Sequence, residues 1–92
     1  MATHMVICTF KDGTDMAEVF AVVDEEQRRA SELAAEGQIG AIHLSLSRGT
    51  VFIGTFAADA GDAEATVRSL PMARWWDLDV FPIAAPAEGA AA

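Results

Sequence analysis

The spacing of apolar side chains changes four times along this chain, and the order of the changes restricts its fold more than any other feature. Clustering or alternation typical of strands covers residues 5–10, 39–47, 51–56 and 77–83. Helical spacing covers residues 16–36 and 63–70. The predicted order of elements is therefore β-α-β-β-α-β. This order is typical of an α+β, ferredoxin-like domain, in which two helices cover one face of an antiparallel four-stranded sheet.

Turn and capping residues mark the boundaries of the predicted elements. Asp15 can cap the first helix through its carboxylate, and Gly37 ends that helix. Segment 48–50 is a short hairpin connection, and Pro71 closes the second helix. Pro82 has no N–H to donate to a sheet ladder, so it is expected at a sheet edge or at the end of its strand.

The chain has 92 residues, of which 52 % are hydrophobic, and this length supports one core. We expect a single domain over residues 1–86 and a flexible tail over residues 87–92. A domain this small buries little more than half of its unfolded surface, so a homo-oligomer is expected. No apolar run approaches the ~20 residues that a bilayer requires, and the start lacks the features of a secretory signal.

Charge and cysteine content narrow the classes of partner. Fourteen acidic and six basic side chains give a net charge of −8, which disfavours nucleic acid and anionic membranes. The single cysteine, Cys8, permits neither an internal disulfide nor a cysteine metal site, and is interpreted as a small buried hydrophobe. These features predict a cytoplasmic protein without a metal site.

One face of the predicted sheet has no helix to cover it. Alternation places polar and apolar side chains on that face together: Thr9, His43, Ser45 and Asp79, with Ile7, Phe81 and Ile83. A mixed face of this kind can pack on a second subunit, line a ligand cleft, or do both.

Two residues are candidates for proton transfer. Glu26 lies at the margin of the apolar stripe of the first helix, where partial burial would raise its pKa toward that of a general acid or base. The alternative is a solvated carboxylate paired with Arg28 or Arg29. His43 has an unperturbed pKa suited to proton transfer, and a structural histidine at the sheet or an interface is the alternative.

Four further residues are candidates for substrate binding. Arg48 and Arg74 can each hold a carboxylate through the guanidinium fork, and the alternative for each is a plain surface charge. Trp75 and Trp76 are adjacent, so one of the two rings is expected to line a cleft or an interface.

The last third of the chain resembles the muconolactone isomerase family. The resemblance rests on Leu70-Pro71, five further residues, and then Asp77-Leu78-Asp79-Val80-Phe81-Pro82-Ile83. Compatible positions upstream are Glu26, Glu32, Leu33, Gly37 and Arg48, so the resemblance spans residues 5–86. It implies a ferredoxin-like subunit of the dimeric α+β barrel type, which assembles through its sheets into dimers and rings of dimers. It also implies cofactor-free movement of a double bond in an unsaturated lactone.

The chain departs from the family's pattern near the implied site. Gln27 stands where the isomerases usually have lysine, and Arg29 where they have an aromatic residue. The second strand has Ile39, Gly40 and His43 in place of the family's tryptophan and arginine. These differences favour another enolisable small molecule, from aromatic or polyketide metabolism, over muconolactone.

The leading hypothesis is an isomerase-like or cyclase-like enzyme in which Glu26 and His43 transfer protons without a cofactor. One alternative is a non-catalytic, homo-oligomeric ligand-binding or partner protein on the same fold. Another is a cofactor-free monooxygenase, which would consume oxygen.

Overall fold

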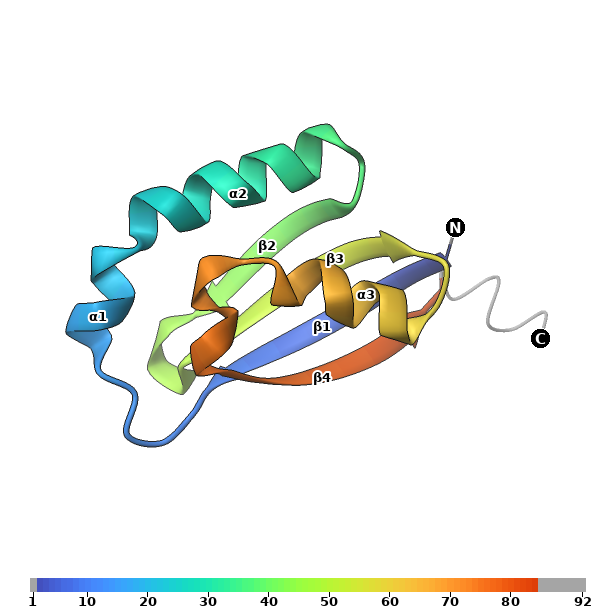
Figure 1. The fold of residues 1–92 in the computed structure, drawn as a ribbon. Helices are drawn as coiled ribbons and strands as arrows, with labels where there is room; N and C mark the ends of the chain where they lie inside the picture. Colours follow the sequence, from blue (N-terminus) through green and yellow to red (C-terminus); the bar gives the residue numbers. More distant parts are fainter. Residues whose placement is uncertain (1, 85–92) are drawn as a thin grey trace.

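Four antiparallel strands form one sheet in the order β2-β3-β1-β4 (Figure 1). In the computed structural model, which describes residues 2–84, the strands are β1 (Ala2–Phe10), β2 (Ile39–Ser45), β3 (Thr50–Ala57) and β4 (Trp76–Ile83). The predicted ferredoxin-like fold is confirmed. Pro82 lies in β4, an edge strand, as its missing N–H requires. The predicted tail over residues 87–92 lies outside the described residues.

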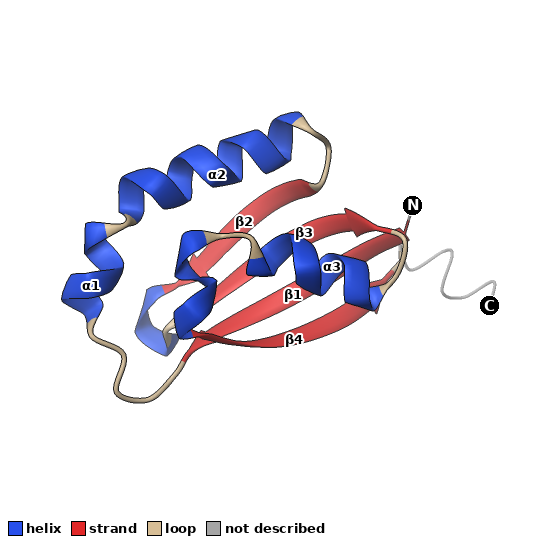
Figure 2. Cartoon of the chain, in the orientation of Figure 1, coloured by secondary structure: helices blue, strands red, loops and turns tan. Residues whose placement is uncertain are grey.

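The α-helices formed by residues 2–84 lie on one side of this sheet (Figure 2). They are α1 (Met16–Ala21), α2 (Val23–Ala35) and α3 (Ala60–Arg68). Two short 3₁₀ turns, η1 (Leu46–Arg48) and η2 (Pro71–Trp75), connect the remaining elements. Helix α3 packs on β1, β3 and β4, whereas α2 contacts β2 and η2. No helix among residues 2–84 is long and apolar enough to cross a membrane.

The predicted caps of the first helical segment are confirmed. The Asp15 side chain accepts a hydrogen bond from the Ala17 N–H at 2.9 Å. Gly37 follows α2 with a φ of 75°, a conformation that glycine adopts without steric cost. The Gln38 N–H then bonds back to the Leu33 carbonyl at 2.9 Å, which completes a Schellman motif.

The single helix predicted over residues 16–36 is in fact two helices, because the helix is interrupted at Val22. Successive β-branched side chains at Val22 and Val23 weaken the local helical preference. The break also changes the direction of the chain (Figure 1). In this way Val19 of α1 and Leu33 of α2 are both buried.

The second predicted helix begins earlier than its apolar spacing indicated. Helix α3 starts at Ala60, where Asp59 accepts a hydrogen bond from the Asp62 N–H at 2.8 Å. It ends at Arg68, and Pro71 starts η2 at the position where its missing N–H costs nothing. The capping acid was a better marker of this helix start than the first apolar residue.

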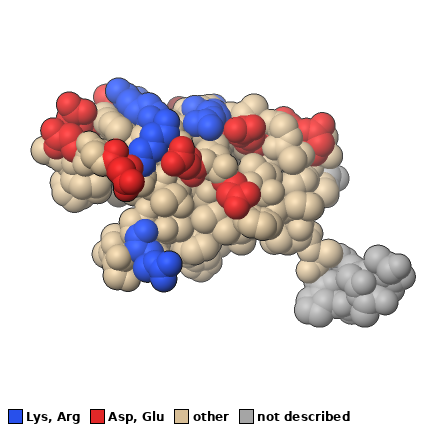
Figure 3. Space-filling view, turned by 90° about the horizontal axis from the view of Figure 1, so that it is seen from below, with Lys and Arg blue, Asp and Glu red and all other residues tan. Residues whose placement is uncertain are grey.

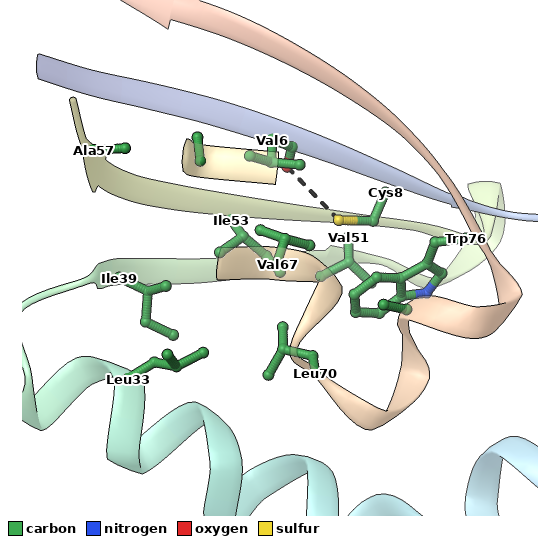
Figure 4. Close-up of a cluster of buried hydrophobic side chains, with 12 residues drawn as sticks. Val6, Cys8, Leu33, Ile39, Val51, Ile53, Ala57, Val67, Leu70 and Trp76 are labelled. Carbon is green, nitrogen blue, oxygen red and sulfur yellow. Dashed lines mark hydrogen bonds between the residues drawn. The ribbon is translucent and has the colours of Figure 1, made fainter. Parts of the chain in front are cut away.

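The core lies between α3, the end of α2 and the covered face of the sheet (Figure 4). Its fully buried side chains come from all of these elements and include Val6, Cys8, Leu33, Ile53, Val67 and Trp76. Only Leu33 of α2 is buried, at the helix's C-terminal end. The N-terminal half of α2 therefore contributes no fully buried side chain to the core.

The opposite face of the sheet is open, and its composition follows the predicted alternation. Register pairs His43 with Phe52, Phe52 with Ile7 and Ile7 with Asp79, so these four side chains form one row across the sheet. The neighbouring rows place Phe81 beside Met5, Ile83 beside Thr3, and Thr9 and Ser45 on either side of Thr50.

Candidate functional site

A cavity of about 620 Å³ lies between α1 and α2 on one side and β2 and β3 on the other. The apolar stripe of the helices lines it, because the stripe turns toward the cavity where α2 leaves the core. Its wall contains Phe10, Met16, Val19, Phe20, Val23, Glu26, Gln27, Ala30, Ile42, Leu44, Ser45, Leu46, Gly49, Thr50, Val51, Ile53, Met72 and Trp76. Phe20, Leu44 and Leu46 are 68 %, 62 % and 86 % exposed, so the rim of the cavity is apolar as well.

Glu26 is the one ionisable side chain in this wall. Its Oε1 accepts a hydrogen bond from the Met72 N–H at 2.9 Å, which joins α2 to η2 across 46 positions of sequence. Burial raises the pKa of the Glu26 carboxyl, and the hydrogen bond from Met72 opposes this effect in part. The carboxylate is therefore held in place and biased toward its protonated form.

The alternative interpretation of Glu26, a carboxylate paired with a neighbouring arginine, is not found in the structure. The ion pairs among residues 2–84 are Arg29 with Glu32 at 3.3 Å and Arg68 with Glu64 at 3.5 Å. Arg29 also donates to the Ser69 hydroxyl at 3.3 Å, which directs it away from Glu26. Glu26 therefore has no cationic partner among the described residues to hold it ionised.

Cys8 is fully buried, as its interpretation as a small hydrophobe required. Burial raises the pKa of its thiol to about 12, with a further increase from the charge of Glu26 and a small opposing effect from Arg68. A thiol with this pKa is protonated at neutral pH and is a poor nucleophile. Cys8 is therefore part of the buried hydrophobic core.

The two tryptophans have different surroundings. Trp76 lines the cavity and packs edge-on against Phe10, with ring centroids 6.0 Å apart. Its indole N–H is buried and has no hydrogen-bond partner among the described residues. Trp75 is half-exposed and lies under the Arg74 guanidinium at 4.7 Å, while Arg74 Nε donates to the Pro71 carbonyl. Arg74 and Trp75 are not part of the cavity wall.

The structure does not bring Glu26 and His43 together within one subunit. Ile42 and Leu44 of β2 line the cavity, so the alternation of the strand turns His43 to the open face. Arg48 also lies on the open side, in a shallow hollow that includes Ile7 and Phe52. The predicted site residues are thus divided by the sheet, with Glu26 and Trp76 on one side and His43 and Arg48 on the other.

Three further polar residues border the cavity, and the sequence analysis assigned none of them a role in this site. Gln27 lies beside Glu26 on α2, whereas Ser45 and Thr50 of the β2–β3 hairpin border both this cavity and the hollow on the open side of the sheet. Helical spacing from Val23 to Gln27 was the available signal for the first of these. The sequence contains no such signal for the two hairpin residues, because both lie where the strands end and side-chain alternation becomes irregular.

The fold agrees with a comparison against protein families. The sequence profile of the muconolactone delta-isomerase family matches residues 3–88 of the chain. The chain belongs to the muconolactone delta-isomerase family. A search of curated proteins finds no match. Membership of the muconolactone delta-isomerase family supports an isomerase-like or related function.

Proposed function

We propose that this protein is a cofactor-independent enzyme that moves a proton on an enolisable carbonyl compound, with Glu26 as the proton-transferring group. The observation that carries the proposal is the position of Glu26 in the cavity wall. It is the one ionisable side chain there, and the Met72 N–H fixes its orientation. A raised pKa brings a carboxyl nearer to neutrality, which is the condition for both accepting and returning a proton.

Glu26 can act as both the base and the acid of the proposed reaction. The carboxylate removes a proton from the carbon α or γ to the carbonyl, and the electron pair of the broken C–H bond forms an enolate. The protonated carboxyl exchanges its proton with solvent water and then protonates the other carbon, which shifts the double bond.

Proton exchange with solvent tests this proposal without knowledge of the natural substrate. We expect the protein, dialysed against a chelator, to accelerate deuterium incorporation into α-angelica lactone, a neutral β,γ-unsaturated lactone, in D₂O. Proton NMR follows the loss of the C3 signals and the appearance of the conjugated isomer. Buffer and heat-denatured protein are the controls. An exchange rate equal to that in buffer, for this lactone and for its longer 5-alkyl homologues, would contradict the proposal.

A non-catalytic ligand-binding protein is the second candidate, and one observation favours it. The hydrogen bond from Met72 gives Glu26 a structural role, since it caps the first free N–H of η2. In that case the lactones would bind in the cavity with no exchange above background. Binding and exchange measured on the same samples therefore separate the two functions.

We also propose that the open sheet face packs against a second copy of the chain. Phe81 and Ile83 are 44 % and 43 % exposed at its edge. Its charges are separated, with Arg48 beside the end of β2 and Asp77 and Asp79 on β4. A two-fold axis that runs along the strands would place the β2 side of one copy over the β4 side of the other. Figure 3, a view from below that of Figure 1, shows acidic and basic side chains mingled along one side of the molecule and one basic group apart from them.

Replacing one exposed phenylalanine tests this assembly. We expect Phe81→Glu to shift the protein from an oligomer to a monomer in light scattering after gel filtration, because it buries a charge in the proposed interface. Phe20→Glu, which alters an exposed phenylalanine on the cavity side, is the matched control and should leave the oligomer intact. A monomeric wild-type protein would rule the assembly out.

A further inference from the structure

The cavity wall formed by residues 2–84 holds no lysine, arginine or histidine. Its polar residues are Glu26 and Gln27, with Ser45 and Thr50 at the border with the open face, and the rest of the wall is aliphatic, aromatic or glycine. An anionic ligand group in this cavity would therefore meet one carboxyl and several neutral dipoles. It would meet no arginine, lysine or histidine supplied by residues 2–84.

The six basic side chains of the chain are all placed elsewhere. Arg29 and Arg68 are engaged with Glu32 and Glu64, and Arg74 lies over Trp75. Arg48 belongs to the hollow on the open side of the sheet. The other two, Lys11 and Arg28, are exposed and outside the wall.

A carboxylated ligand is therefore a poor match for this cavity. Its charge would lose hydration on entry and gain no ion pair. It would also lie near Glu26, which must be ionised to accept a proton, and like charges held in one water-poor site disfavour each other's ionisation. A neutral ligand avoids both effects and leaves Glu26 able to act as a base.

The size of the cavity also favours a ligand with an extended apolar part. At about 620 Å³ it falls in the middle of the range typical of sites for drug-sized molecules, and a small lactone fills only part of it. The exposed side chains of Phe20, Leu44 and Leu46 extend its apolar surface outward. The space beyond Glu26 thus suits an extended hydrocarbon or aromatic group.

We infer that the substrate is an uncharged, predominantly apolar carbonyl compound with an extended hydrocarbon or aromatic part, and not a lactone carboxylic acid. The inference rests on the proposed function for the role of the carbonyl group. It concerns binding, however, and binding can be measured whether or not turnover occurs.

A matched pair of ligands tests the inference. One is a 5-alkyl butenolide with a terminal carboxylate, and the other is its methyl ester, so that the pair differs in charge. Calorimetry on the wild-type protein at neutral pH should show the ester bound on the order of 100-fold more tightly than the acid. Affinity should also rise as the alkyl chain of neutral homologues is lengthened from methyl to octyl.

A charge placed in the wall provides the second arm. Gln27→Lys adds a cation beside Glu26 at an exposed position, so the fold is expected to tolerate it. It should strengthen binding of the acid and so reduce the ratio of the ester's affinity to the acid's affinity. Gln38→Lys makes the same change outside the wall and should leave the preference unaltered.

The outcomes separate this inference from the proposed function. Tight binding of the ester without deuterium exchange would leave the inference standing and contradict the enzymatic proposal. Equal or tighter binding of the acid, or failure of the neutral series to bind, would overturn the inference even if exchange were observed.

Discussion

Glu26→Gln is expected to lower the rate of deuterium exchange by about 10²–10⁴-fold, the usual contribution of a positioned general base. An amide cannot accept the substrate proton at neutral pH. Its oxygen can still accept the hydrogen bond that the Met72 N–H donates at 2.9 Å, so the local structure is expected to persist. The loss of rate should therefore occur in a protein that remains folded.

The neighbouring residue supplies the control for this variant. Glu25 lies on the same helix, is exposed and is not part of the cavity wall, so Glu25→Gln makes the identical chemical change in water. It should exchange at the wild-type rate. Exchange by Glu26→Gln at the rate of Glu25→Gln would show that another group removes the proton.

The same variant should change how stability depends on pH. Burial raises the pKa of Glu26, so the folded state holds this proton more tightly than the unfolded chain does. Ionised Glu26 therefore lowers the free energy of unfolding. The loss of stability reaches its full size above the raised pKa that Glu26 has in the folded state. It is absent below the pKa of a glutamate in the unfolded chain, at about pH 4.

Thermal unfolding across this pH range gives the check. Glu26→Gln should be more stable than the wild type at pH 7, and the difference should disappear toward pH 4. The exchange activity of the wild type should rise with pH through the raised pKa of Glu26, since only the ionised form is a base. A wild type more stable than Glu26→Gln at pH 7 would mean that the charged carboxylate stabilises the fold.

Trp76→Ala is expected to lower the free energy of unfolding by about 3–5 kcal/mol, the range for loss of a large aromatic side chain from a core. The side chain is 1 % exposed and packs against Phe10. That loss is a large share of the total stability of a small domain. Chemical denaturation of the variant measures it directly, and Trp75→Ala, which removes the half-exposed ring, should cost much less.

Trp76→Phe separates packing from hydrogen bonding. It keeps an aromatic ring in the core and removes an N–H that has no partner among the described residues, so no hydrogen bond of the fold is lost. We expect a smaller loss of stability than for Trp76→Ala, because an aromatic ring still fills most of the same space. An equal loss in the two variants would contradict the assignment of Trp76 to aromatic packing in the core.

The fold was predictable because its information is local. The spacing of apolar residues changes from strand to helix and back within single elements, and Asp15 and Gly37 mark the ends of the first helical region. The break at Val22 was not predictable in this way. Met16, Val19, Phe20 and Val23 keep one helical stripe through it, and the successive β-branched residues Val22 and Val23 weaken a helix without being enough to end it.

The site was predictable only in part. Glu26 was identified because it lies beside an apolar stripe, but its hydrogen bond with Met72 joins positions 46 residues apart and has no local signal. The separation of Glu26 from His43 depends on which face of the sheet the helices cover. Alternation in β2 predicts that Ile42 and His43 point to opposite faces of the sheet. The position of α2 decides that the covered face is the one with Ile42.

Alternation in β2 also has an evolutionary consequence. Ile42 and Leu44 shape the cavity, while His43 between them belongs to the opposite surface. Point substitutions at neighbouring positions therefore act on different properties of the protein. A lineage can change what the cavity accepts and preserve the other surface, or the reverse. Insertion of one residue in this strand would exchange the two sets of side chains and disrupt both surfaces at once.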